Sequence, residues 1–256
     1  MAERAFAFVP MNPREEKPRK RGLTEIRGPY YDTMGTRRLR DVFETMGPYV
    51  DGLKFAGGAF ALMERERLAE ILALAHEFDV YVSTGGWAEY VLSKGADVFK
   101  RYVEECAAIG FDVVELSLGF VTLPQDDLVR LVEDTVKAGV KAKPELGIRF
   151  GAGGGEVSAA ELAQQGTRDS SWVVARGRAC LDAGADIIMI ESEGITENVQ
   201  AWRTDVVSDI VDGLGMNNGS DVNLFVDHSQ ITQLECLRRG IWGTPNTWGR
   251  VLTYRG

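Results

Sequence analysis

Charged and hydroxyl side chains stand two residues apart in three strand-like runs of this sequence. The pairs are Glu115 with Ser117, Lys143 with Glu145, and Glu191 with Glu193. Side chains two apart share one face of a strand, because successive residues point to opposite faces. Three neighbouring strands therefore direct carboxylates to one place. Isolated buried carboxylates are costly, so such a cluster needs a metal cation or an opposed Lys or Arg.

A hard divalent cation is one partner that suits this chemistry. Mg²⁺ prefers oxygen ligands, so it is one cation that such a cluster of carboxylates suits. The alternative interpretation is a set of salt bridges that hold the strand ends together, with no metal.

Basic residues stand at the ends of the same or neighbouring runs. Lys54, Lys143 and Arg27 oppose the carboxylates, with Lys17 and Arg19 a short distance upstream. Basic groups beside a carboxylate-bound metal are what a phosphorylated or carboxylated substrate requires. Lys54 or Lys143 could instead form a Schiff base, as in barrel aldolases.

Further strand-end residues complete the candidate substrate site. Gly85 and Gly86 allow the backbone to approach an anion closely. Ser117 and His228 each end a strand-like run, and Glu89 follows the glycine pair. In parallel α/β folds, active sites lie at the carboxyl ends of the strands. We therefore expect these residues to line the substrate site.

The elements that must position these residues alternate between strand and helix. Seven strand-like runs are expected at residues 23–27, 50–55, 80–84, 113–117, 140–146, 187–191 and 222–227. Apolar residues at helical spacing lie between them, for example Leu68, Ile71, Leu72 and Ala75.

Glycines punctuate the junctions between these helices and strands. Gly110, Gly139 and Gly184 each end a helical pattern directly before a strand, which suits a left-handed C-cap. Such βα repetition predicts parallel strands joined by helical crossovers. We predict one TIM-type (β/α)8 barrel over residues 22–256 after an extended segment at 1–21, with a doubly wound open sheet as the alternative. Only seven of the eight units are recognised, so one βα unit near Asn218 and Gly219 is either missing or unrecognised.

Composition limits the possible partners. The chain has 256 residues, 45% of them hydrophobic, and a formal net charge of -9. This charge gives no general attraction to nucleic acid or anionic lipid. No apolar run approaches the roughly 20 residues that span a bilayer. Three cysteines without C-x-x-C spacing are expected to be reduced, and the protein to be cytoplasmic.

The strand-end stretches resemble the phosphosulfolactate synthase family, whose enzymes add sulfite to phosphoenolpyruvate on the way to coenzyme M. The stretches include Arg21-Gly22-Leu23-Thr24, Asp51-Gly52-Leu53-Lys54-Phe55, Gly85-Gly86-Trp87-Ala88-Glu89, Glu115-Leu116-Ser117 and Ala183-Gly184-Ala185-Asp186. The resemblance implies a (β/α)8 barrel, Mg²⁺ dependence, a homo-oligomer and a lyase that forms a carbon–sulfur bond. It also implies that Lys54 binds substrate anions, and that Glu115, Glu145 and Glu191 are the candidates for metal binding or acid–base catalysis. Lys54, Lys143 and Glu145 are the catalytic candidates.

This chain departs from the archaeal synthases in three respects. Arg27 stands where they carry an acidic residue at the end of the first strand. The stretch Arg-Gly-Pro-Tyr-Tyr at 27–31 and the one from Val226 to Gln230 look closer to plant heat-stress-associated proteins. The family also has another strand and helix between Asn218 and Gly219. Two alternatives to a synthase therefore stay open: a barrel that acts in stress tolerance through binding, and a Schiff-base aldolase.

Overall fold

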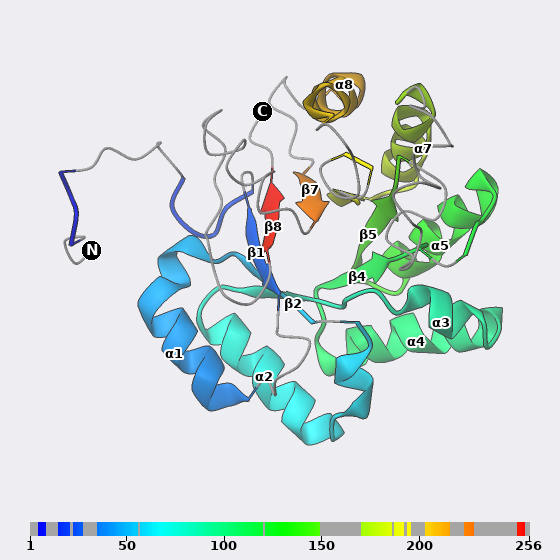
Figure 1. The fold of residues 1–256 in the computed structure, drawn as a ribbon. Helices are drawn as coiled ribbons and strands as arrows, with labels where there is room; N and C mark the ends of the chain where they lie inside the picture. Colours follow the sequence, from blue (N-terminus) through cyan, green and yellow to red (C-terminus); the bar gives the residue numbers. More distant parts are fainter. Residues whose placement is uncertain are drawn as a thin grey trace.

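The computed structural model gives the fold of most of the chain (Figure 1). It describes residues 5–8, 15–20, 23–27, 35–55, 57–119, 121–148, 170–185, 187–191, 194–195, 203–215, 223–227 and 250–253. The statements below concern these residues. None of their helices is long and apolar enough to cross a membrane.

The strands form a hydrogen-bonded ring at the centre of the molecule (Figure 1). They are β1 (Thr24–Arg27), β2 (Gly52–Lys54), β3 (Tyr81–Ser83), β4 (Val113–Leu116), β5 (Lys141–Leu146), β6 (Ile187–Ile190), β7 (Asn223–Asp227) and β8 (Arg250–Thr253). Each strand from β1 to β7 lies within one of the seven predicted runs, and each strand from β1 to β6 pairs in parallel with the next. The predicted parallel α/β fold is therefore confirmed.

Strand β8 departs from the predicted architecture. It pairs antiparallel with both β7 and β1, so it closes the ring without being an eighth βα unit. A barrel of eight repeated βα units is thus not shown by the described residues. The position of the predicted missing unit, at Asn218 and Gly219, lies outside them.

Helices surround the ring on its outer side (Figure 1). They are α1 (Thr36–Met46), α2 (Arg65–Glu77), α3 (Ala88–Leu92), α4 (Ala96–Ile109), α5 (Gln125–Lys137), α7 (Ser171–Asp182) and α8 (Thr204–Gly213), with 3₁₀ turns η1 (Gly47–Tyr49) and η2 (Ala59–Leu62). Helix α2 buries the predicted apolar stripe. Gly110, Gly139 and Gly184 have φ values of 109°, 89° and 102°, which confirms the predicted left-handed helix ends.

The apolar residues form two separate clusters. The larger one fills the space between the strands and the helices and includes Leu53, Val114 and Ile188. The smaller one comprises Leu23, Val113, Ile187 and Met189, with Tyr81 packed against it. Its residues alternate along their strands with those of the larger cluster, so they face the inside of the ring. The next inward positions, Glu25 and Glu115, are therefore also interior.

The segment before β1 is tied to the amino-terminal ends of the strands. Arg19 donates a hydrogen bond to Asp51 at 2.6 Å, and Asp51 accepts another from the Thr24 backbone amide at 2.7 Å. Lys17 donates to the Phe78 carbonyl at 2.7 Å. Asp51 and Phe78 both precede strands, so Lys17 and Arg19 lie at the end opposite to the strand-end candidates. These two basic residues therefore do not belong to the candidate substrate site.

Candidate active site

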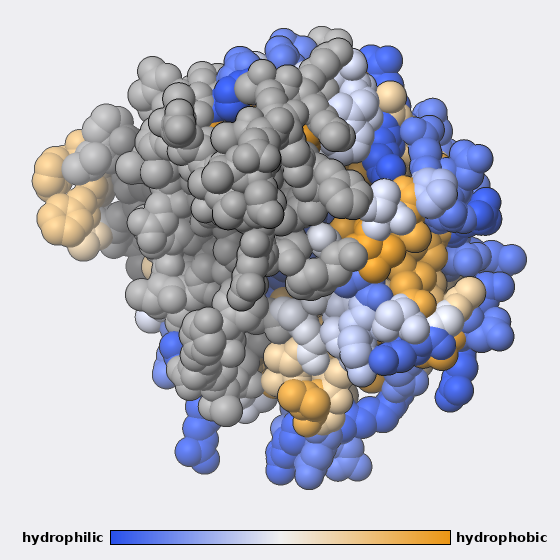
Figure 2. Space-filling model, turned by 45° about the vertical axis from the view of Figure 1, so that its right-hand side comes forward, coloured by the Kyte–Doolittle hydropathy of each residue, from blue (hydrophilic) through white to orange (hydrophobic). Residues whose placement is uncertain are grey.

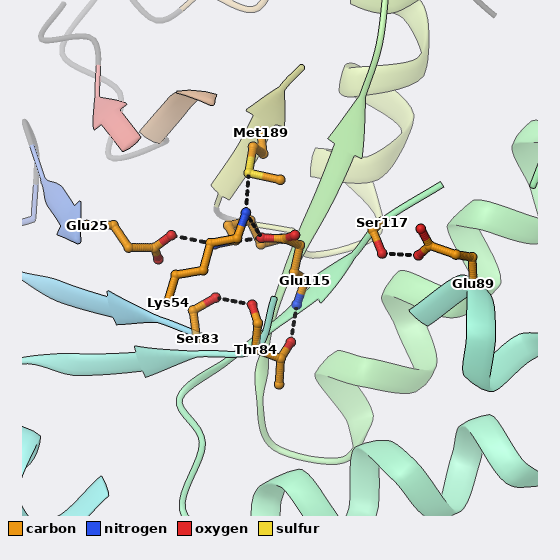
Figure 3. Close-up of polar contacts among 9 residues, drawn as sticks. Glu25, Lys54, Ser83, Thr84, Glu89, Glu115, Ser117 and Met189 are labelled. Atoms are coloured by element: carbon orange, nitrogen blue, oxygen red, sulfur yellow. Dashed lines mark hydrogen bonds and ion pairs between the residues drawn. The ribbon is translucent and has the colours of Figure 1, made fainter. Parts of the chain in front are cut away.

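Four ionisable side chains meet inside the ring of strands (Figure 3). Lys54 Nζ lies 2.7 Å from Glu115 Oε2. Lys143 Nζ lies 2.8 Å from Glu25 Oε1 and 3.2 Å from the same Glu115 oxygen. Each of the four is at most 3% exposed. We call Glu25, Lys54, Glu115 and Lys143 the charge cluster.

Side chains alternate between the two faces of each strand, which explains why the charge cluster lies next to the smaller apolar cluster on the inside of the ring. Leu23 and Glu25 share the inner face of β1, and Val113 and Glu115 share that of β4. The cluster contains two formal positive and two formal negative charges, so it is neutral as a whole. Compensation of this kind is what allows ionised groups to stay in the interior.

Hydrogen bonds from neighbouring strands fix the cluster. The backbone amide of Glu115 donates to Thr84 Oγ1 at 2.9 Å, which joins β4 to the end of β3 (Figure 3). Lys54 Nζ also contacts Met189 Sδ at 3.6 Å, across the interior on β6. Lys54, on β2, thus contacts side chains from β4 and β6.

Tyr81, which packs against the smaller apolar cluster, borders the charge cluster on that side. Burial raises the pKa of its phenol well above the ordinary value, and the nearby Glu25 carboxylate raises it further. Tyr81 therefore stays protonated at physiological pH. The sequence predictions included neither Glu25 nor Tyr81, although Glu25 stands two residues before Arg27 on the same face of a predicted strand. That spacing was the signal that could have identified it.

The loop after β3 passes close to the cluster. A Cβ on Gly85 would lie 2.1 Å from the Phe55 carbonyl oxygen, so the backbones of two loops meet where only glycine fits. A Cβ on Gly86 would lie 3.4 Å from Ser117 Cβ and 3.6 Å from Glu115 Oε1. Gly86 therefore borders the polar groups directly. That this loop binds an anion stays a prediction.

Ser117 and Glu89 form a second polar contact beside the charge cluster (Figure 3). The Ser117 hydroxyl, just past the end of β4, donates a hydrogen bond to Glu89 Oε2 in the first turn of α3. Ser117 is 2% and Glu89 8% exposed. The structure thus connects Gly86, Ser117 and Glu89 into one side of the site.

The three predicted metal ligands do not form one group. Glu115 contacts the two lysines of the charge cluster, whereas Glu145 and Glu191 belong to the carboxyl ends of β5 and β6. Glu145 is half-buried and Glu191 is buried. Within the described residues, no three His, Cys, Asp or Glu side chains are grouped so that they could hold a metal ion. Carboxylates are ligands that suit Mg²⁺, which often uses one or two of them together with substrate oxygens; that Glu145 or Glu191 binds this ion stays a prediction.

Two further candidates are placed only in part or not at all. The backbone of Arg27 pairs with Lys54 in the register of β1 and β2. The Arg27 side chain and His228 lie outside the described residues. Their roles in substrate binding stay predictions.

A groove of about 800 Å³ lies elsewhere on the molecule, between η2, α2, α3 and α4. Aromatic residues contribute to its lining, among them Phe60, Trp87 and Tyr102. It contains none of the predicted site residues. Its lining is mainly apolar, so it does not suit a small multiply charged substrate.

A known family of enzymes matches nearly the whole chain. The model of the (2R)-phospho-3-sulfolactate synthase (ComA) family matches residues 12–218 and 216–244. The chain belongs to this family. The two matched segments meet at residues 216–218, beside the position where the sequence predicts a missing βα unit. Family membership supports an enzyme of the lyase kind that acts on small molecules.

Two relatives of this chain have names that refer to different functions. The chain is 36% identical to the protein Heat-stress-associated 32 of Arabidopsis thaliana over 259 residues, covering 91% of both chains. It is 29% identical to the phosphosulfolactate synthase of Methanothermobacter thermautotrophicus over 272 residues, covering 96% of this chain and 98% of that protein.

Solved structures share the fold at low sequence identity. Oxaloacetate acetylhydrolase in complex with oxalate aligns with a TM-score of 0.51 and 12% identity, over 88% of this chain and 75% of that one. The carboxyl transferase domain of Rhizobium etli pyruvate carboxylase with 3-hydroxypyruvate aligns with a TM-score of 0.53 and 12% identity. That match covers 86% of this chain and 39% of the other. These similarities concern the fold alone.

Proposed function

We propose that this protein is a phosphosulfolactate synthase-like lyase that adds sulfite, or a similar small nucleophile, to phosphoenolpyruvate. The observation that carries the proposal is the charge cluster, in which two buried ammonium groups flank the Glu115 carboxylate. A structural barrel gains little from four buried charges, because apolar side chains of the same volume stabilise an interior at least as well. Buried groups of this kind are typical of functional sites.

The reaction balances without an oxidant or reductant. Bisulfite supplies the sulfur atom and one proton. A bond forms between sulfur and the methylene carbon of the enol ester, the double-bond electrons move toward the substrate carboxylate, and the proton is finally added to carbon two. No leaving group departs, so the phosphate ester stays intact.

The proposed roles follow from where negative charge develops. Lys54 stabilises the charge that accumulates on the substrate carboxylate, and Lys143 supports it by neutralising Glu115 from the other side. Glu145, half-buried at the carboxyl end of β5, is the proposed proton donor to carbon two. Ser117, Gly85 and Gly86 contribute the neighbouring side of the substrate site.

Mg²⁺ belongs to this proposal as a cofactor held by Glu191 together with substrate oxygens, because Glu145 cannot bind the cation while it carries the proton for carbon two. A bound divalent cation would supply additional positive charge beside the substrate carboxylate or phosphate. A homo-oligomer, which the family resemblance implies, likewise stays a prediction.

Turnover with defined substrates tests the proposal. The wild-type protein is incubated with phosphoenolpyruvate, sulfite and Mg²⁺, and the loss of enol absorbance is followed together with the mass of the product. We expect enol loss that requires sulfite and is abolished in Lys54→Met. The matched control is Lys137→Met, which removes an exposed lysine on α5 and leaves the rate unchanged. Absence of enol loss in the wild type refutes the synthase.

The second candidate is a role in stress tolerance through binding. It is favoured by the 36% identity to the Arabidopsis protein, which is higher than the 29% identity to the synthase. The two proposals differ in turnover. Protection of a heat-sensitive test protein by both the wild type and Lys54→Met, without enol loss in either, supports the binding role.

No structural observation favours the Schiff-base aldolase. A lysine that forms a Schiff base is activated by an apolar pocket or a neighbouring cation. Lys54 and Lys143 are neighbouring cations, since both contact Glu115 Oε2, but each also lies 2.7 Å or 2.8 Å from a carboxylate oxygen that compensates its charge.

A further inference from the structure

We infer that residues 5–8 of one copy of this chain bind the groove between η2, α2, α3 and α4 of a second copy. The segment is Ala5-Phe6-Ala7-Phe8, and we call it the aromatic arm. The inference does not depend on the proposed reaction, because neither the aromatic arm nor the groove contains a residue of the candidate active site. It identifies the surfaces through which two copies assemble.

The aromatic arm exposes two large rings. Phe6 is 67% and Phe8 82% exposed, and their ring centroids lie 6.1 Å apart in an edge-to-face arrangement. The arm is at the left of Figure 1, and Figure 2 shows it as a hydrophobic projection at the left edge of the molecule. Soluble proteins rarely leave contiguous apolar surface in water unless a partner covers it. The two rings are therefore suited to anchor the arm on a partner.

The groove offers a surface of matching chemistry. It has a volume of about 800 Å³, and Phe60, Trp87 and Tyr102 contribute rings to its lining. The centroids of these three rings are 5.4, 5.6 and 6.4 Å apart, within the range of about 4.5–7 Å at which aromatic pairs attract each other. Pockets of about 300–1,000 Å³ hold organic ligands of moderate size, so the groove has room for two phenyl side chains.

Exposed apolar side chains gather at these two places. Among the described residues, eight large hydrophobic side chains are exposed, of which two belong to the aromatic arm and three to the groove or its edge. Val98 lines the groove, and Leu62, at 91% exposure, ends η2. Tyr90 stacks on Trp87 with a centroid distance of 5.7 Å. One copy thus leaves both surfaces exposed, the arm at the left of Figure 1 and α3 and α4 at the lower right.

The charges beside the two surfaces are complementary. Arg101 and Glu104 line the groove, are exposed, and form no ion pair with another described residue. In the sequence, Glu3 and Arg4 directly precede the aromatic arm. One acidic and one basic residue beside the arm therefore match one basic and one acidic residue beside the groove. Such pairs at the rim of an interface favour the correct partner and orientation.

The available area favours a reciprocal exchange of arms. A buried Phe contributes about 150–250 Å², so the exposed fractions of Phe6 and Phe8 leave about 300 Å² per arm to be buried. With an equal area of groove, one docked arm buries about 600 Å², which is less than the roughly 1,200–2,000 Å² of a stable interface. Two arms exchanged about a two-fold axis reach about 1,200 Å². We therefore expect a dimer in which each copy holds the arm of the other.

The first test is the mass of the full-length protein in solution. Light scattering after size-exclusion chromatography should give twice the chain mass of 28.2 kDa. Sedimentation equilibrium should show that Phe6→Ser/Phe8→Ser weakens dimerisation by at least about a hundredfold, because one aromatic hot spot is worth about thirtyfold or more. The matched control is Met46→Ser, which removes an exposed apolar side chain on α1 outside the groove and should leave the dimer unchanged. Circular dichroism establishes that the variants are folded.

The second test is cross-linking between two different variants. Ala7→Cys places a thiol between the two rings of the arm, and Ala61→Cys places one in the groove lining. The two proteins are mixed, equilibrated and treated with a short bismaleimide. We expect a product that joins residue 7 of one chain to residue 61 of the other, identified by peptide mass spectrometry. Ala175→Cys, at an exposed position on α7, replaces Ala61→Cys as the control and should give no such product.

Three results would overturn the inference. The first is a wild-type protein with the mass of one chain, and the second is an oligomer whose stability the arm variant leaves unchanged. The third is a cross-link that is absent from the mixture and forms only within single chains of Ala7→Cys/Ala61→Cys, because the arm then occupies the groove of its own copy. None of these results bears on turnover, so the inference and the proposed function stand or fall separately.

Discussion

Replacing Lys143 by methionine is the sharpest perturbation of the charge cluster. The substitution keeps the apolar stem of a side chain that is 0% exposed and removes its ammonium group. Glu25 then loses the partner at 2.8 Å, while Glu115 keeps Lys54 at 2.7 Å. The cluster changes from neutral to a net charge of one negative unit, with Glu25 buried and uncompensated.

Removal of one partner from a buried ion pair costs about 3–5 kcal/mol. For a chain of this size, each kcal/mol corresponds to about 2–4 °C in Tm, so we expect Lys143→Met to lower Tm by roughly 6–20 °C. The double variant Glu25→Leu/Lys143→Met removes both charges and leaves the Lys54–Glu115 pair balanced. It should recover most of the lost stability, because an apolar replacement of a buried pair is often neutral.

Thermal denaturation followed by circular dichroism measures the change in Tm, and guanidinium denaturation of the same variants together with Glu25→Leu gives the unfolding free energies of a double-mutant cycle. The matched control is Arg40→Met, which breaks the exposed pair between Arg40 and Glu77 and should cause no measurable change. Two results would refute the reasoning: a Lys143→Met protein as stable as the control, or a double variant that is less stable than either single one.

Two other perturbations give predictions away from the ion pairs. Gly85→Ala should lower the unfolding free energy by about 1–3 kcal/mol or more, because the added Cβ would lie 2.1 Å from a backbone oxygen. Gly86→Ala should leave the denaturation midpoint nearly unchanged, because its Cβ contacts would be 3.4 Å or longer. Burial raises the pKa of Cys106 to about 12 and that of Cys180 to about 11, from an ordinary value of 9.0, so neither thiol should react with a maleimide at neutral pH in the folded protein. Peptide mapping that found either cysteine labelled as fast as in the denatured chain would contradict this lack of reactivity. The stability that the two protonated thiols contribute is fully present below pH 9 and is lost as pH rises toward 11 and 12, because the thiols of the unfolded chain ionise first.

The sequence was sufficient for the elements that obey local rules. Apolar runs and the glycines at 110, 139 and 184 predicted β1 to β7 and the helix ends, because both depend on a few neighbouring residues. Strand β8 was not predicted, because it is a four-residue run that pairs antiparallel and does not follow the βα alternation of the rest of the chain. Its pairing depends on residues more than 200 positions earlier in the chain, which no local pattern indicates.

The site was predicted only as a set of residue types. Lys54, Glu115 and Lys143 were correctly placed on strands, which are β2, β4 and β5. Alternation along single strands could not show that Glu115 contacts the two lysines and forms no group with Glu145 and Glu191. Glu25 was not predicted, because the candidates were residues at the carboxyl ends of strands and Glu25 lies within β1. The Ser117–Glu89 contact joins a strand end to a helix, so it requires the three-dimensional arrangement of α3 and β4.

The most direct test of the account is a crystal structure of the protein soaked with phosphoenolpyruvate. The account predicts electron density for the anion at the carboxyl ends of the strands, within hydrogen-bond distance of Lys54 and beside Gly86. Density in the aromatic groove between α2 and α4, or none at the strand ends at a concentration that supports turnover, would contradict it.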